Sequence, residues 1–376
     1  MNKTSIQWAH STVNPVMGCL GCELFPQPGA VLEAIDAALG RVVAGWKPGD
    51  AEAALRPEVH AAFAAIASPQ PGHTHALTTT NIVHVSKAWA SELKDMHGVA
   101  AEKAVREAID GMVVCYAAKL HLNRATSIVA PHRKPNPGYA PSFERMRTYA
   151  GRMADSARQR DLLGTSDPDK TWADGLPRMI FVGDMGDTFA RQSDFDFIAS
   201  DVIPAIVSPE GRRHLWLVLS KRPEKMADFA RIHGKFPGNV CCMTTVTSKD
   251  TLGRLDDLRS IDCAMRGISV EPLWERLPLE SLNLEGIDWM ILGGASGARW
   301  SAKPFQLAWA RELRDFCREK KVAFFLKQLG SNPFDGDRPF KCADRHGGQW
   351  HEWPEDLRVR EFPLGFHAYR RGEVAT

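Results

Sequence analysis

The sequence has no apolar run near the ~18–20 residues that a membrane-spanning helix requires. Lys3 is followed by no apolar segment, so a secretory signal peptide is not expected. An excess of one charge is also missing, because 47 Lys and Arg residues are balanced by 45 Asp and Glu residues. The net charge of +2 excludes a general attraction to nucleic acid, although a local basic region remains open. We expect a soluble, cytoplasmic protein without a membrane partner.

Cysteine is scarce for a disulfide-stabilised protein, with eight residues in 376. The thiols are therefore expected to be free to bind a metal or cluster. Two nucleotide-binding patterns are missing, since no G-x-G-x-x-G follows a predicted strand and no G-x-x-x-x-G-K-S/T occurs. With 44% hydrophobic and 24% charged residues, the composition is that of a folded globular chain.

Four regions of the chain differ in composition. Residues 1–22 begin with a short apolar piece and end in a glycine-rich turn, and residues 23–114 are rich in alanine. Apolar residues recur at helical spacing in the second region, as in Val105, Ala108, Ile109, Met112 and Val113. We expect a barrel start in 1–22, a helical insertion in 23–114, a (β/α) barrel in 115–330 and a C-terminal extension in 331–376.

Short β-branched or apolar runs predict strands in the second half of the chain. They are Met179–Val182, Leu215–Leu219, Val240–Val246, Arg266–Val270, Trp289–Leu292 and Val322–Leu326. Helical patterns lie between most of them, at 194–206, 223–232, 249–260 and 305–320. This alternation is typical of βα units, so the sequence predicts an α/β fold with a parallel sheet that forms a complete or partial (β/α) barrel.

Polar residues follow nearly every predicted strand. They include Asp184, Asp187, Ser220, Lys221, Ser269, Glu271, Gly293, Gly294, Ser296 and Lys327. Catalytic groups of βα barrels lie at the carboxyl ends of strands, so these residues are candidates for one shared site. Simpler roles stay open, because Asp187 suits a helix cap, Gly293-Gly294 a tight turn, and Lys221 a solvated loop.

The cysteines fall into two groups. Cys241 and Cys242 lie within one predicted strand, where one faces each side, and both are expected to be buried apolar side chains, as are Cys263 and Cys317. Cys342 lies near two histidines, but the spacing matches no standard metal pattern. The pair Cys19 and Cys22 forms a C-x2-C in a glycine-rich turn, which suits zinc, an iron–sulfur cluster or a dithiol.

The opening segment resembles a known family. It carries Trp8, then Asn14-Pro15-Val16-Met17-Gly18-Cys19, and then Gly21-Cys22. This resembles the phage-associated three-Cys-motif family of radical-SAM-like barrel proteins, which begins WNPVTGC, continues with GC and soon reaches CYA. In this chain the last motif, Cys115-Tyr116-Ala117, comes only after residues 23–114.

The resemblance resumes downstream in the same order. The similar segments are FVGDMGD (181–187), LSKRPEKM (219–226), SVEPL (269–273), LGGASG (292–297) and FFLKQLG (324–330). Two departures stand out. Ala295 occupies the place of a family glutamate, and Gly183-Asp184 replaces an asparagine and a serine.

The resemblance implies a barrel of the radical-SAM type with a [4Fe–4S] cluster on Cys19, Cys22 and Cys115, shielded by Tyr116. Three thiolates leave one iron open, which in radical-SAM enzymes holds the amino and carboxylate groups of S-adenosylmethionine (SAM). One electron then cleaves SAM to methionine and a 5′-deoxyadenosyl radical. A continued helix through Val113 would carry Cys115 on the edge of its apolar face.

The resemblance also assigns roles at the strand ends. Asp184, Lys221 and Glu271 are the expected catalytic residues. The expected cofactor-binding residues are Tyr116, Asp184, Ser220, Ser269, Glu271, Gly293, Gly294, Ser296 and Lys327. These roles come from the position of each residue within a matched motif.

The resemblance favours nucleic acid as the substrate, for modification or repair, and leaves peptides and small molecules open. Local basic residues suited to phosphate are His132-Arg133-Lys134, Arg145, Arg147, Arg158 and Arg160. Expected partners are a companion protein on the helical insertion and an electron donor such as flavodoxin or ferredoxin. Two other functions stay open: a zinc-binding barrel hydrolase, and a non-enzymatic interaction protein that has lost its cofactor.

Overall fold

The computed structural model describes residues 6–69, 73–124, 128–130, 138–140, 142–297 and 303–370. The chain divides into two compact units, which are described separately. The barrel unit is residues 1–15 and 149–376, and the helical unit is residues 16–148. The helical unit is wider than the expected insertion, because the chain enters and leaves it through two short strands paired antiparallel, β2 (Val16–Met17) and β3 (Arg147–Thr148).

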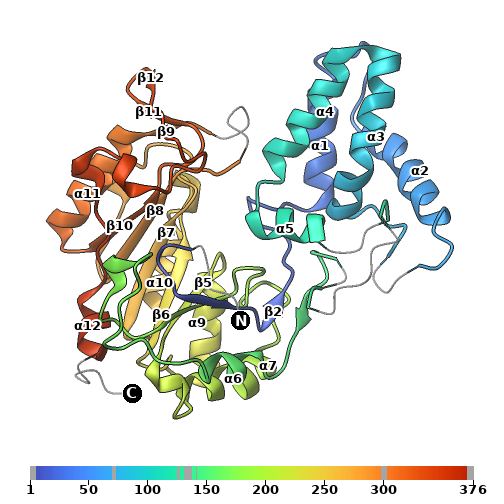
Figure 1. Cartoon of the computed structure of the whole chain (residues 1–376). Helices are drawn as coiled ribbons and strands as arrows, with labels where there is room; N and C mark the ends of the chain where they lie inside the picture. Colours follow the sequence, from blue (N-terminus) through green and yellow to red (C-terminus); the bar gives the residue numbers. More distant parts are fainter. Residues whose placement is uncertain are drawn as a thin grey trace. The chain divides into compact units, whose positions relative to one another are not determined.

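The barrel unit is built on a seven-stranded parallel sheet (Figure 1). Its order is β1 (Ser11–Val13), β4 (Met179–Val182), β5 (Leu215–Ser220), β6 (Val240–Thr245), β7 (Met265–Val270), β8 (Trp289–Gly293) and β10 (Ala323–Gln328). The sheet is curled and open, with β1 and β10 as its edges, so the partial-barrel form of the prediction is confirmed. All six predicted strands are present, with ends shifted by at most two residues.

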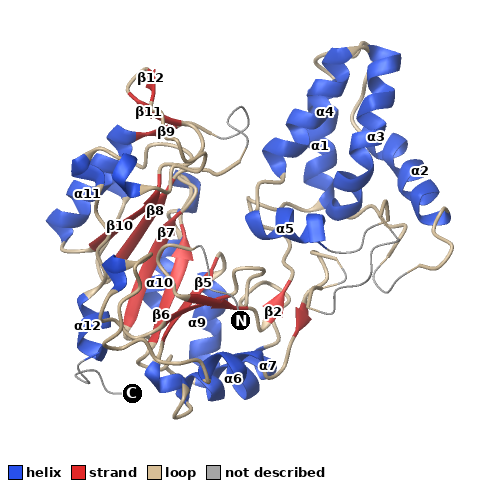
Figure 2. Cartoon of the chain, viewed as in Figure 1, coloured by secondary structure: helices blue, strands red, loops and turns tan. Residues whose placement is uncertain are grey.

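Helices lie along one face of this sheet (Figure 2). They are α6 (Arg152–Ala157), α7 (Phe195–Phe197), α8 (Ile203–Val207), α9 (Pro223–His233), α10 (Arg254–Ser260) and α11 (Leu307–Lys320). Their apolar side chains share one buried cluster with alternate strand residues such as Val182, Val218 and Ile268. We call this the outer face of the sheet, and the opposite side the inner face.

The inner face has its own apolar cluster. It contains strand residues such as Phe181, Leu217 and Ile291, together with Trp8. Phe366 of α12 (Leu364–Arg370) packs against Trp289, with 5.4 Å between ring centroids. Aromatic side chains from both chain ends therefore fill the inside of the open barrel. The expected division of the two strand cysteines is confirmed, because Cys241 belongs to the inner cluster and Cys242 to the outer one.

The C-terminal extension covers the edge strand β10. The Leu326 amide donates to the Val359 carbonyl and the Glu361 amide donates to the Phe324 carbonyl, both at 2.9 Å. The Arg360 guanidinium lies 4.0 Å from the Trp172 ring centroid, and Arg360 donates to the Leu326 and Lys327 carbonyls. An edge strand covered in this way no longer presents free backbone groups for unwanted pairing.

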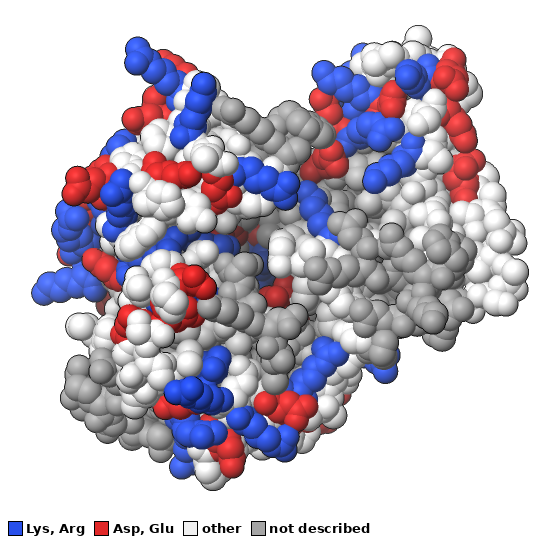
Figure 3. Space-filling model, viewed as in Figure 1, with Lys and Arg blue, Asp and Glu red and all other residues white. Residues whose placement is uncertain are grey.

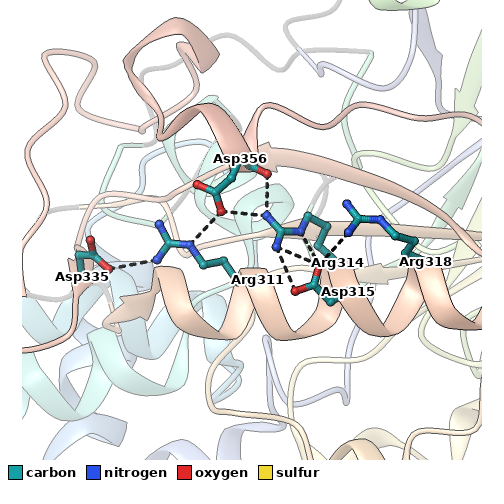
Figure 4. A network of polar contacts seen from close by, with 6 residues as sticks. All are labelled: Arg311, Arg314, Asp315, Arg318, Asp335 and Asp356. Atoms are coloured by element: carbon teal, nitrogen blue, oxygen red, sulfur yellow. Dashed lines mark hydrogen bonds and ion pairs between the residues drawn. The ribbon is translucent and has the colours of Figure 1, made fainter.

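Ion pairs also join the extension to α11 (Figure 4). Asp356 accepts from Arg311 at 2.9 Å and from Arg314 at 2.8 Å, and Arg311 reaches Asp335 at 3.2 Å. Asp335 lies in β11 (Pro333–Asp335), which pairs with β9 (Phe305–Gln306) and β12 (Arg338–Pro339) in a small second sheet. Such exposed pairs orient the segments more than they stabilise them.

The helical unit packs around a core of its own. Its helices are α1 (Pro28–Leu39), α2 (Asp50–Ala64), α3 (Thr79–His97), α4 (Val99–Met112) and α5 (Tyr116–Arg124). Ile35, Ile82, Trp89 and Val105 are among the residues buried between them. The Glu144 carboxylate accepts from the Thr80 amide at 2.6 Å, which satisfies a free N–H at the start of α3. No helix within the described residues is long and apolar enough to cross a membrane.

His10 makes the barrel unit sensitive to acid. Its side chain is buried, and Nδ1 accepts from the Met179 amide at 2.9 Å, which requires the neutral ring. Burial, assisted by the nearby charges of Lys170 and Arg178, lowers the pKa of His10 to about 4. The unfolded chain binds a proton near the ordinary histidine pKa of about 6.5, so acid favours unfolding between these two values.

We therefore expect the free energy of unfolding to fall by about 2–3 kcal/mol more in the wild type than in a His10→Asn variant between pH 7 and pH 4.5. Urea denaturation at a series of pH values measures this difference. His233→Asn, on the surface helix α9, is the control and should follow the wild-type curve. Parallel curves for wild type and His10→Asn would contradict the prediction.

Candidate functional site

The loop after β4 holds one candidate carboxylate, Asp184. Asn14 Nδ2 donates to Asp184 Oδ1 at 2.6 Å, and Asn14 Oδ1 accepts from the Met185 amide at 2.8 Å. Burial raises the pKa of Asp184, although the hydrogen bond from Asn14 opposes the shift. Asn14 is therefore a site residue that sequence reasoning missed, and its signal was the Asn-Pro step that follows β1.

The next acidic residue, Asp187, connects two strand-end loops. Its Oδ2 accepts from the Lys221 amide and its Oδ1 from the Phe189 amide, both at 2.9 Å. Ser220 belongs to the outer face, where its hydroxyl accepts from the Arg222 amide at 2.9 Å. Both polar side chains thus satisfy backbone groups of the loops after β4 and β5. The half-buried Lys221 side chain lies on the loop that they shape.

An ion pair links the ends of β7 and β10. Lys327 Nζ lies 2.9 Å from Glu271 Oε1, with side-chain exposures of 24% and 12%. Ser269 Oγ donates to Glu271 Oε2 at 3.3 Å. β8 runs between these two strands, and a Cβ at Gly293 would lie 2.6 Å from Glu271 Oε1. The carboxylate therefore occupies the space that a side chain on β8 would fill.

The neighbouring glycine serves a similar purpose. A Cβ at Gly294 would lie only 2.2 Å from the Leu329 carbonyl oxygen, so backbone packing against the segment after β10 requires glycine there. Gln328 Nε2 donates to Ser296 Oγ at 2.7 Å and to the Gly294 carbonyl at 3.0 Å. Contacts within the chain therefore account for both glycines, and Ser296 lies exposed beside them.

The three candidate cysteines all belong to the helical unit. The Cys19 amide donates to the Phe143 carbonyl at 2.7 Å, and Gly18 adopts a φ of +93° with no space for a side chain. The Cys115 amide donates to the Leu24 carbonyl at 2.8 Å, and the Val114 amide donates to the same oxygen at 3.0 Å. The chain therefore leaves near Cys22, forms four helices and returns to within two residues of it.

The local structure around Cys115 differs from the continued helix that we expected. α4 ends at Met112, Val113 is not helical, and α5 begins at Tyr116. Cys115 thus lies in the break, because the amides of Val114 and Cys115 bond to Leu24 instead of continuing the helix. The side chain of Tyr116 is 59% exposed. Cys19, Cys22 and Cys115 are all partly exposed, free thiols.

No group of three or more His, Cys, Asp or Glu side chains among the residues that the structure describes is arranged as a metal site. The cluster ligands therefore stay a prediction that rests on donor chemistry and on the backbone return. Cys263 and Cys317 are buried, as expected. Burial raises the pKa of Cys342 to about 11, with the charges of Glu352 and Asp344 adding to the shift.

A family model described as "Protein of unknown function (DUF5131)" matches residues 104–354, about two thirds of the chain. The chain belongs to this family. No curated protein and no solved structure gives a significant match. The DUF5131 match begins within α4 and includes Cys115 and all the strand-end residues described above. Cys19 and Cys22 precede the matched region.

One further polar residue of this DUF5131 protein lies at a strand end and was missed in the sequence. Thr245 ends β6 on the inner face, two positions after Met243 of the inner cluster. It is 1% exposed, and its hydroxyl has no hydrogen-bond partner in the described parts of the chain. Its register partner on β7 is Ser269. The signal was present in the sequence as a threonine at the end of a buried strand.

The charges seen on the surface are mixed. On the face drawn in Figure 3, basic and acidic side chains lie interspersed over the described surface. Arg145 and Arg147 are exposed, and Arg158 pairs with Asp155 at 2.6 Å. The basic residues His132-Arg133-Lys134 lie outside the described residues. The partial balance of charges makes a narrow contact with phosphates more plausible physically than a broad electrostatic one.

We expect Gly293→Ala to lower the free energy of unfolding by about 1–3 kcal/mol, because the new methyl group displaces the Glu271 carboxylate from Lys327. Thermal or urea denaturation measures the loss. Gly253→Ala is the matched control, since a Cβ there meets nothing within 4 Å and the residue has a helical φ of −56°. Equal stability of the two variants would show that the carboxylate does not need this space.

Proposed function

We propose that this protein is an iron–sulfur enzyme of the radical-SAM type. In this proposal Cys19, Cys22 and Cys115 hold a [4Fe–4S] cluster, and the inner face at the strand ends of the barrel unit holds SAM. The open parallel half-barrel agrees with such an enzyme. So does the order of the motifs at its strand ends.

The observation that carries the proposal is the return of Cys115. Residues 23–114 could have displaced this cysteine to any distance from the C-x2-C turn. Instead, two consecutive amides, those of Val114 and Cys115, bond to the carbonyl of Leu24. The helices in between bury their apolar side chains in a core of their own, so they form without needing the cysteine at that point. A structural linker alone has no need for this double backbone anchor.

The donor set suits a cluster with one open iron. Three partly exposed thiols supply three ligands, and iron–sulfur clusters are held by cysteine thiolates. When bound, the cluster and SAM would supply one-electron reductive cleavage chemistry. Asp184, oriented by Asn14, would hold a proton at its carboxyl group, because burial already favours the protonated form. Glu271 and Lys327 would bind and orient polar groups of the ligand.

Nucleic acid is the substrate class that we propose, for modification or repair. Its support is limited to exposed arginines such as Arg145 and Arg147 beside β3. A companion protein on the helical unit and a flavodoxin- or ferredoxin-type electron donor complete the proposal. Both are partners that such chemistry requires or commonly recruits.

Replacement of the cysteines tests the ligand set. We expect Cys19→Ala, Cys22→Ala and Cys115→Ala each to lose most of the iron and sulfide that the wild type binds after anaerobic reconstitution, because each removes a thiolate ligand. Metal and sulfide analysis measures the content per chain. Cys342→Ala is the control, since this thiol with a raised pKa lies outside the proposed set.

The same analysis separates the alternatives. Full iron and sulfide in Cys115→Ala would refute the three-cysteine site. Stoichiometric zinc in place of iron would favour the hydrolase. A wild-type protein that binds neither metal would favour the interaction protein.

A spectroscopic measurement tests for an open iron. We expect the reduced wild type to show the electron paramagnetic resonance signal of a [4Fe–4S]⁺ cluster, and this signal to change when SAM is added. Glu271→Gln should keep the cluster signal and need more SAM for the same change, because it weakens ligand binding in the barrel unit. A signal that SAM leaves unchanged would contradict the cofactor assignment.

A further inference from the structure

The inner face of the barrel unit carries one pair of opposite charges at its carboxyl edge. Glu271 ends β7 and Lys327 ends β10, and they meet at 2.9 Å although β8 separates their strands. Gly293 on β8 leaves the space in which the Glu271 carboxylate lies. The pair is therefore assembled across three strands by a specific glycine, which a surface ion pair does not need.

The partners around the pair leave hydrogen-bonding capacity unused. Ser269 Oγ reaches Glu271 Oε2 only at a long distance of 3.3 Å. On the adjacent strand, the buried hydroxyl of Thr245 has no partner among the described residues. A buried hydroxyl without a hydrogen bond costs about 1–3 kcal/mol, so a ligand that supplies one is favoured here. Glu271 and Lys327 both keep some contact with solvent, through which such a ligand can reach them.

The charges determine which ligand suits the site. An anion alone would pair with Lys327 and leave the mostly buried carboxylate of Glu271 without a counter-charge, which is costly. A cation alone would leave Lys327 in the same position. A ligand that carries both charges on neighbouring atoms gives each side chain a new partner and adds no net charge to the site.

We propose that this pair binds the α-amino-acid group of a ligand. Its ammonium group pairs with Glu271 and its carboxylate with Lys327, while the hydroxyls of Thr245 and Ser269 supply further hydrogen bonds. The inference deepens the proposed function, since it names the chemistry recognised at the strand ends. Two sources have this chemistry: the amino-acid end of SAM, and a free amino acid.

Calorimetric titration with matched probes tests the proposal. The probes are L-methionine, the same molecule without its carboxylate (3-(methylthio)propylamine), and the same molecule without its amino group (4-(methylthio)butanoate). We expect both truncated probes to bind at least about tenfold more weakly than methionine, because each leaves one charged side chain unpaired. Equal binding of either truncated probe, or no binding of methionine and SAM at millimolar concentration, would overturn the proposal.

A variant with exchanged charges provides a second test. Glu271→Lys combined with Lys327→Glu keeps an ion pair but places each charge where the other was, so we expect methionine binding to fall at least about tenfold. The matched control is the same exchange at an exposed pair, Arg276→Glu with Glu312→Arg, whose side chains lie 2.7 Å apart. Wild-type affinity in the first variant would overturn the proposal, and the probe series decides if that variant does not fold.

Competition identifies the source of the amino-acid group. If SAM displaces methionine and 5′-methylthioadenosine does not, the site holds the amino-acid end of SAM. If methionine still binds at saturating SAM, it holds a separate amino acid. Titrations with and without reconstituted iron and sulfide separate the two proposals. Methionine binding without a cluster refutes only the iron–sulfur function, and a cluster without methionine binding refutes only this inference.

Discussion

Parallel pairing of seven strands is the constraint on which the rest of the barrel unit depends. Because all the strands run the same way, their carboxyl ends meet at one edge, and residues distant in sequence gather there. Alternation along each strand then sorts the side chains between helices and interior. Glu271 and Lys327 face the interior by this rule, whereas Ser220 joins the helix side. The same pairing leaves two edges, and the C-terminal extension covers that of β10.

The helical unit solves a different physical problem. A long insertion between two residues that must meet costs little in loop entropy when the insertion folds by itself and its ends lie together. Here the ends meet through the backbone at Leu24 and through the paired strands β2 and β3. The buried core of Ile35, Trp89 and their neighbours compensates for ordering these residues. Such an insertion can vary without disturbing the segment that carries Cys115.

Several features of the protein followed from local patterns. The six strands of the second half and the opposite orientation of Cys241 and Cys242 were predictable, because a period of two along an apolar run reflects local geometry. The strand-end positions of Glu271 and Lys327 were predictable for the same reason. Their contact was not, since it depends on sheet order and on the absence of a side chain at Gly293. The hydrogen bond from Asn14 to Asp184 likewise joins residues far apart in the chain.

The sequence by itself determined the fold class, the strand positions and the candidate residues, since each depends on neighbours within a few positions. Only the tertiary structure decided which candidates serve the chain itself. Asp187 and Gly294 satisfy loops and backbone packing, while Glu271, Lys327 and the unpartnered Thr245 occur on the inner face. The tertiary structure also ended the helix before Cys115, because the Leu24 carbonyl competes for amides that a continuing helix would use. Long-range hydrogen bonds of this kind leave no periodic trace in a sequence.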